Sequence, residues 1–141
     1  MKPFSYFLFF GALFSCLMGC MKNLPENDDV EKGNDFIGDW LVSEKSSILG
    51  DRVYSIIISV DSVKNNQLNI QNLYALGIEE YVYVEESTFD PNSFTIPSQT
   101  VSNHSISGSG TLIDDQIEMT YFVDDSNVKD TVKTTCTKDF P

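Results

Sequence analysis

Few side chains in this sequence are suited to catalysis. The chain of 141 residues holds one histidine, His104, and three cysteines. The last cysteine, Cys136, lies in the alternating segment KTTCTK, on the face that also carries Val132 and Thr134. This position predicts a buried, inert thiol. A reactive thiol would need a histidine beside it, and only the fold could bring His104 there.

Paired carboxylates, which could do acid–base chemistry, recur along the chain. They are Glu79-Glu80, Glu85-Glu86, Asp114-Asp115 and Asp124-Asp125. Neighbours in a strand point to opposite faces, so such pairs do not form a catalytic dyad. The segment DDSNVKD has many oxygen ligands but lacks the glycine and the terminal glutamate of a calcium loop. Without a G-x-S-x-G motif or a phosphate-binding loop, the sequence predicts no enzyme, no cofactor and no metal site.

The other two cysteines, Cys16 and Cys20, lie at the end of an uncharged apolar run that follows Lys2. The run is shorter than the roughly 20 residues that a membrane-spanning helix needs. A basic start followed by a short apolar stretch is the layout of a secretory signal peptide. A metal pair is not expected here, because the flanking residues are apolar and offer no further ligand.

The end of this run, Leu17-Met18-Gly19-Cys20, resembles the lipobox of bacterial lipoproteins. In that family the cysteine thiol is joined to diacylglycerol, and cleavage leaves the cysteine as an acylated N-terminus. The resemblance implies a signal peptide over residues 1–19 and a membrane anchor on Cys20, with acyl chains such as palmitate. Each buried methylene contributes about 0.8 kcal/mol, so two or three chains make the attachment effectively permanent. The alternatives are a retained anchor helix and a secreted protein whose signal ends in cysteine.

Residues 21–35 are polar and acidic, and Pro25 and Gly33 interrupt them. With the lipidated Cys20 they predict a disordered tether over residues 20–35, whose root-mean-square span as a flexible coil is about 20 Å. Acidic residues soon after a lipid-modified cysteine resemble the surface-export signals of Bacteroidetes lipoproteins. This resemblance implies an outer-membrane location, facing the periplasm or the cell surface.

The formal net charge of −12 limits the partners of the chain. An acidic protein repels phosphate groups, so nucleic-acid binding is not expected. Anionic lipid headgroups are repelled for the same reason, and the expected membrane partner is reached through the anchor on Cys20.

From residue 36 on, the segments RVYSIIISVDS, DQIEMTYFVDD and DTVKTTCTK alternate between apolar and polar residues. A period of two predicts half-buried strands of an antiparallel sheet. We expect about eight strands, near residues 36–44, 52–61, 67–74, 79–86, 93–97, 100–107, 109–114 with a continuation over 116–124, and 129–138. The division around Gly108 and Gly110 stays open, because one bent strand fits as well.

No segment shows helical periodicity, so the predicted fold class is all-β. Many short strands at even spacing favour an antiparallel up-and-down barrel over residues 36–141, with a β-sandwich as the alternative.

The first expected strand begins FIGDWLVSEK, where Gly38-Asp39-Trp40 resembles the Gly-x-Trp motif that opens lipocalins. With IQNLYALG, FTIPSQTV, SISGSGTL and IEMTYFVDD, it makes residues 36–138 similar to small lipocalin-like lipoproteins of Bacteroidetes, a group of undefined function. The resemblance implies that Gly38 permits close backbone approach and that Trp40 plugs one barrel end. Lipocalins often place an arginine from a late strand over this tryptophan, whereas the only arginine here is Arg52.

A barrel of about eight strands is just wide enough to be filled by side chains or to hold one small ligand. The residues expected to line any interior space are Tyr54, Ile58, Met119 and Tyr121. Gly108 and Gly110 share one face of their segment, which predicts either a strand bend or interior space.

Two triplets, Asp61-Ser62-Val63 and Asp130-Thr131-Val132, resemble the O-glycosylation signal of Bacteroidetes envelope proteins. Ser62 and Thr131 are therefore candidate glycosylation sites.

The sequence as a whole predicts a lipid-anchored binding or accessory module for a small apolar ligand or an envelope partner. The alternative is a structural or inhibitory surface protein that acts through its loops and has no ligand cavity. A third hypothesis is a hydrolase, which would require His104 beside a carboxylate in a cleft.

Overall fold

The computed structural model describes residues 35–64 and 67–138. The predicted signal peptide, Cys20 and nearly all of the predicted tether lie outside the described residues. The strands are β1 (Gly38–Ser46), β2 (Gly50–Val60), β3 (Gln67–Gln71), β4 (Tyr81–Glu86), β5 (Ser93–Val101), β6 (His104–Ile113), β7 (Gln116–Asp124) and β8 (Lys129–Lys138).

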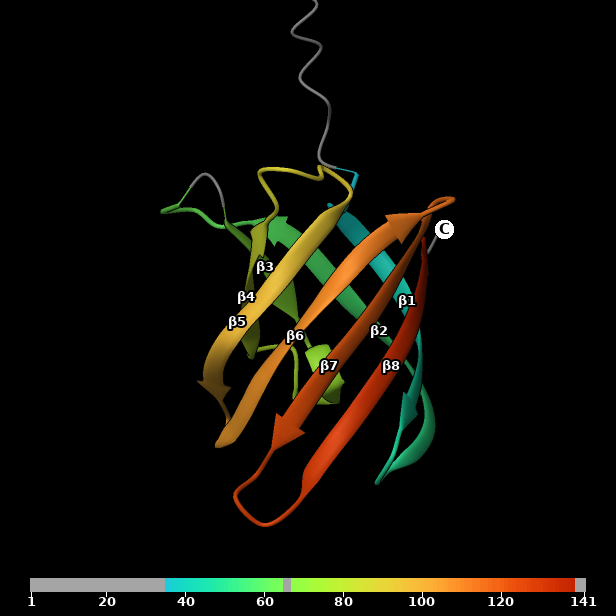
Figure 1. Cartoon of the computed structure of the whole chain (residues 1–141), viewed down its shortest axis with the longest axis vertical. Coiled ribbons are helices and arrows are strands. Elements are labelled where there is room, and N and C mark those ends of the chain that lie inside the picture. The colour runs from blue at the N-terminus through green and yellow to red at the C-terminus, as the bar shows by residue number, and fades with distance from the viewer. Residues whose placement is uncertain (1–34, 65–66, 139–141) are drawn as a thin grey trace, which may run out of the picture. The chain divides into compact units, whose positions relative to one another are not determined.

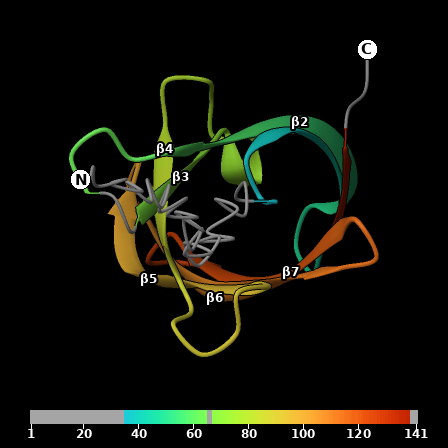
Figure 2. The ribbon, with the colours of Figure 1, turned by 90° about the horizontal axis from the view of Figure 1, so that it is seen from above.

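Each strand pairs with the next, and β8 pairs with β1, so the sheet closes into an antiparallel barrel (Figures 1 and 2). The predicted all-β, up-and-down, lipocalin-like barrel of eight strands is thereby confirmed. The β-sandwich alternative is wrong, because one continuous ladder joins all the strands. Closure also removes the unpaired edges at which open sheets aggregate.

The alternating pattern places one face of each strand in the barrel interior. In β7 and β8 buried and exposed residues alternate almost without exception. The opposite face, which includes Leu41, Ile57 and Phe122, is exposed. Period-two patterning therefore determines which side chains fill the core.

The strand boundaries in the middle of the chain differ from the prediction. β6 runs without a break through Gly108 and Gly110, so the single strand, one of the two possibilities left open there, is confirmed. The expected continuation of residues 109–114 into 116–124 is wrong, because β7 is a separate strand. The breaks lie instead at two-residue hairpin turns, Ser102–Asn103 and Asp114–Asp115, where all four residues have positive φ. Two consecutive residues with positive φ are typical of type I′ turns, which favour asparagine and aspartate.

Backbone pairing between β4 and β5 is limited to Glu85 with Thr95 and Glu86 with Phe94. Farther along β5, the register with β6 shifts between Ile96 and Gln99, a stretch that contains Pro97, which has no N–H to donate. The Gln99 side chain takes over from the ladder at this point. Its Oε1 accepts the Tyr83 N–H at 3.0 Å, and its Nε2 donates to the Tyr83 carbonyl at 2.8 Å. One amide side chain thus holds the two strands together where the backbone pairing stops.

The connections gather at two ends of the barrel (Figure 1). At the entry end, where the described chain begins, lie the loops after β2, β4 and β6. At the far end lie the connections after β1, β3, β5 and β7, including a short 3-10 turn, η1 (Leu73–Ala75). Within the described ranges, no helix is both long enough and apolar enough to cross a membrane.

Candidate functional site

The entry half of the interior is apolar and is organised around Trp40. The indole is fully buried, and its Nε1 donates a hydrogen bond of 2.7 Å to the carbonyl of Phe36. The Phe36 ring meets the Phe94 ring edge to face, with centroids 5.1 Å apart. Aromatic packing of this kind adds to the stabilisation that burial alone provides.

A lysine from the last strand lies against this tryptophan. The ammonium of Lys138 is 4.4 Å from the centre of the Trp40 ring and donates to the Ile37 carbonyl at 2.7 Å. A Cβ at Gly38, whose φ is +135°, would lie 3.2 Å from the same ammonium. Lys138 therefore occupies the place that the resemblance gives to a late-strand arginine, and the sequence reasoning missed it.

The glycines of β6 make room for aromatic side chains of the neighbouring strands. Gly110 pairs with Phe94, and a Cβ on Gly110 would overlap the Phe94 ring. Gly108 pairs with Tyr121 on the other side, and a Cβ there would overlap β7. The space that the glycines leave is thus filled by other side chains.

The far half of the interior is polar and is centred on Glu44, which is 1% exposed. Arg52 pairs with Glu44 across β1 and β2 and donates to its Oε1 from two nitrogens, the Nε bond measuring 2.8 Å. The hydroxyls of Tyr54 and Tyr121 both donate to Oε2, at 2.5 and 2.7 Å. A buried carboxylate is tolerated only when its charge and lone pairs are matched in this way.

These contacts fix the protonation states in the cluster. Burial raises the pKa of Tyr54, and its hydrogen bond to Glu44 raises it further. Burial is also the main cause that raises the pKa of Tyr121. For Arg52, burial opposes the charge, but the hydrogen bond and the charge of Glu44 outweigh it and raise the pKa. Both phenols therefore remain donors, and the arginine remains a cation.

Tyr74, in η1, extends the cluster towards the far end. Its φ of 60° and ψ of 16° are left-handed, which is an outlier for a bulky residue. Its N–H donates to the Tyr54 hydroxyl at 3.0 Å, and its ring centre lies 4.6 Å from the Arg52 guanidinium. The surrounding contacts hold this strained conformation, which is a feature typical of functional sites.

The Tyr74 hydroxyl donates to Asp130 of β8 at 2.8 Å. Asp130 also accepts from the Ser46 hydroxyl at 2.5 Å, from the N–H and hydroxyl of Ser47 at 2.8 Å each, and from the Ile48 N–H at 3.2 Å. Burial opposes ionisation of Asp130, but these hydrogen bonds outweigh it and lower its pKa. One carboxylate thereby joins β8, the turn after β1 and η1.

A cleft of about 190 Å³, the far-end cleft, opens over Tyr74 and Asp130. Three exposed apolar side chains form part of its lining, namely Ile48, Leu49 and Val128, which are 54%, 49% and 43% exposed. The remaining lining residues are His104, Val123 and Asp125. The cleft thus combines an apolar rim with a buried polar base.

The four residues predicted to line an interior space all lie inside the barrel. Ile58, Met119 and Tyr121 are between 0% and 2% exposed and belong to the hydrophobic core. Tyr54 is half-buried and engaged with Glu44. In the described part of the chain, every buried side-chain nitrogen or oxygen has a hydrogen-bond partner. Ile58, Met119 and Tyr121 are therefore covered by other side chains, and Tyr54 is engaged with Glu44.

Cys136 is fully buried, as predicted, and burial raises the pKa of its thiol to about 12. It lies near the entry end of β8, whereas His104 begins β6 at the far end, so the two are not brought together. The described residues include no group of three or more side chains that could hold a metal ion.

The two candidate glycosylation sites differ in their surroundings. Ser62 is exposed in the loop after β2. Thr131 is exposed as well, but Asp130 of its triplet is 3% exposed and occupied by the contacts above.

The sequence reasoning also missed Glu44, Tyr74 and Asp130. One signal was present, because Glu44 follows Trp40 and Val42 at the spacing of an inward-facing strand position. A charged residue on a buried face indicates a matched partner inside the protein.

The chain matches no family model, and no curated protein matches it significantly.

Proposed function

We propose that the protein is a lipid-anchored binding module of the bacterial outer membrane, held through Cys20 and engaging an envelope partner at the far-end cleft. The anchor is supported by the resemblance of Leu17–Cys20 to a lipobox. The binding role is carried by the far-end cleft, in which exposed apolar side chains surround a rigid polar base. It is a non-enzymatic role.

The position of the cleft supports this proposal. The described chain begins at the entry end (Figure 1), whereas the residues that line the cleft belong to the far-end connections and the strand ends beside them. An anchor on Cys20 would join the barrel through residue 35, at the end opposite the cleft. A partner could reach Leu49 and Val128 without displacing the attachment.

The rim of the cleft is also preorganised. The Ser46 hydroxyl accepts from the N–H groups of Ile48 and Leu49, at 3.1 and 2.6 Å, and Asp130 accepts from Ile48 as well. A turn held in this way loses little conformational freedom when it binds, which favours affinity.

The size of the cleft indicates which partner it takes. Pockets for drug-sized ligands measure about 300–1,000 Å³. The far-end cleft, at about 190 Å³, suits a single apolar side chain of another protein better than a whole small molecule. The burial of Ile58, Met119 and Tyr121 in the core likewise favours the alternative in which the protein acts through its loops.

Site-specific crosslinking in the native cell tests this proposal. A photoreactive phenylalanine analogue replaces Leu49 in the full chain, and a matched variant carries it at Phe122, which is 53% exposed on the barrel wall. We expect a discrete protein adduct from position 49, absent from position 122 and abolished by Val128→Asp. The proposal fails if position 49 gives no adduct, or if both positions give the same ones.

A further inference from the structure

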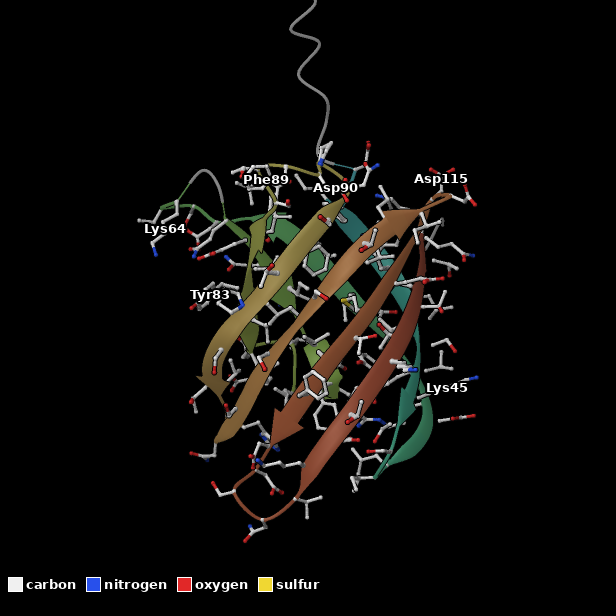
Figure 3. All side chains as sticks on the ribbon, in the orientation of Figure 1. Lys45, Lys64, Tyr83, Phe89, Asp90 and Asp115 are labelled. Carbon is white, nitrogen blue, oxygen red and sulfur yellow. The ribbon has the colours of Figure 1, made fainter. Side chains whose placement is uncertain are left out.

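Two loops at the entry end each present an apolar side chain that is almost wholly exposed. Phe89, in the loop after β4, is 98% exposed, and Val63, in the loop after β2, is 85% exposed. Figure 3 labels Phe89 at the tip of the entry end. Single exposed apolar residues are normal on soluble proteins, so exposure alone assigns no role.

Both loops hold these side chains outward in the same way. The Ser87 hydroxyl accepts from the N–H groups of Phe89 and Asp90, at 3.2 and 3.1 Å. The Asp61 carboxylate accepts from the N–H groups of Val63 and Lys64, at 2.7 and 2.9 Å. These hydrogen bonds close a turn over residues 61–64 and another over residues 87–90, and each turn restrains its apolar residue from folding back onto the barrel.

The charges beside the two loops indicate which kind of lipid surface the entry end could contact. Asp61 is held within its own loop, where backbone N–H bonds from Val63 and Lys64 lower its pKa. Lys64 is exposed next to Val63 and offers a cation to a phosphate group. The acidic turn Asp114–Asp115 lies at the same end and repels an anionic surface. This combination suits a zwitterionic phospholipid headgroup layer better than an anionic one.

We infer that the entry end is a membrane-contacting surface, at which Phe89 and Val63 enter the headgroup region of a phospholipid bilayer. The inference rests on the proposed lipid anchor. An anchor at Cys20 would bring the chain to the barrel at this same end, and would keep both loops at a high effective concentration beside the bilayer. Two side chains are too few to hold the protein alone, but they add a second point of contact that orients the barrel with the far-end cleft outward.

Depth-sensitive fluorescence on the full lipidated chain tests this inference. The chain is reconstituted in vesicles of phosphatidylcholine and phosphatidylethanolamine, with an environment-sensitive NBD probe on a cysteine introduced by Phe89→Cys. Matched variants carry the probe through Leu49→Cys at the far end and Phe122→Cys on the wall. The native thiol, Cys136, is buried with a raised pKa and does not compete for the label.

The probe at position 89 is expected to emit at shorter wavelength and to be quenched by lipids spin-labelled at a depth of roughly 5–10 Å. The probes at 49 and 122 should behave as in water. The same quenching is expected for Val63→Cys and should fall when Phe89→Asp is added. This inference alone is overturned if all the labelled chains float with the vesicles but the probe at position 89 behaves as in water. It is also overturned if the probes at all positions are quenched equally. Failure of every chain to float with the vesicles overturns the anchor, and with it the proposed function.

Discussion

The two halves of the barrel interior are stabilised in different ways. In the entry half, Trp40 and Phe94 pack among apolar neighbours, and removing volume there costs stability in proportion to the cavity left. In the far half, Glu44 and Asp130 are each surrounded by donors. Such a cluster loses stability abruptly when one member is removed, because the remaining groups stay buried without a partner.

This difference indicates which half of the interior has its conformation most closely specified. A fully satisfied polar network specifies one arrangement of its members more than it adds net stability. The far half contains that network, the strained Tyr74 and the far-end cleft. The apolar half holds the barrel together, and the polar half determines the form of the end that we propose to bind.

The largest expected effect is on Glu44. Glu44→Ala leaves Arg52 and the hydroxyls of Tyr54 and Tyr121 without their acceptor, and should lower the free energy of unfolding by about 3–5 kcal/mol. Urea denaturation measures this change. Asp51→Ala, at an exposed position of the neighbouring strand, is the matched control and should change stability by less than about 0.5 kcal/mol.

Replacing the whole cluster tests whether the cost of Glu44→Ala comes from the buried partners that it leaves behind. A chain with Glu44→Leu, Arg52→Leu, Tyr54→Phe and Tyr121→Phe should be more stable than Glu44→Ala alone. In the fourfold variant only the N–H and carbonyl of Tyr74 lose a partner, whereas Glu44→Ala leaves a guanidinium and two phenols without their acceptor. If the fourfold variant is instead the less stable of the two, the network itself stabilises the polar half, and the difference proposed between the two halves is wrong.

A smaller effect is expected in the entry half from Gly110→Ala. The added Cβ would overlap the Phe94 ring, and overpacking of this kind typically costs about 1–3 kcal/mol. Adding Phe94→Leu should recover part of the loss, so the double variant should be more stable than the two separate costs predict. Strictly additive changes in the free energy of unfolding would show that ring and glycine do not share this space.

The smallest expected effect is local and depends on acid. The pKa of Asp130 is lowered in the folded state, so its contribution to stability is complete above the unfolded pKa, about 3.9, and is lost as pH falls through the folded value. As the pH is lowered past about 4, the amide protection factors at Ser47 and Ile48 should therefore decrease before the protection factor of the Trp40 indole N–H does. Asp130→Asn should remove this pH dependence, and equal losses in both halves would contradict it.

Three strands could be predicted from the sequence because their pattern is local. β2, β7 and β8 alternate along their length, and a period of two is sufficient to identify them. The sequence left the division at Gly108 and Gly110 open, because glycine in a strand also marks breaks. A Cβ on Gly110 would meet the Phe94 ring and one on Gly108 would meet the backbone of β7, and no local pattern reveals either contact.

The far-end cluster could be predicted only in part. Glu44 stands out as a charge on an inward-facing position. Tyr74 and Asp130, however, are 56 residues apart in the chain and meet only because the fold brings η1 to the far end of β8. The left-handed backbone of Tyr74 has no sequence signal, since tyrosine is among the residues least expected there.

The junction of β4 and β5 has a consequence for how the barrel unfolds. Backbone pairing joins β4 to β5 only at Glu85 with Thr95 and at Glu86 with Phe94, and beyond these pairs the Gln99 side chain joins the two strands. We therefore expect β4 and β5 to separate locally while the rest of the sheet stays intact. Hydrogen exchange of the Tyr83 amide would report this local separation, and the hydrogen bonds of the Gln99 side chain would determine how often it occurs.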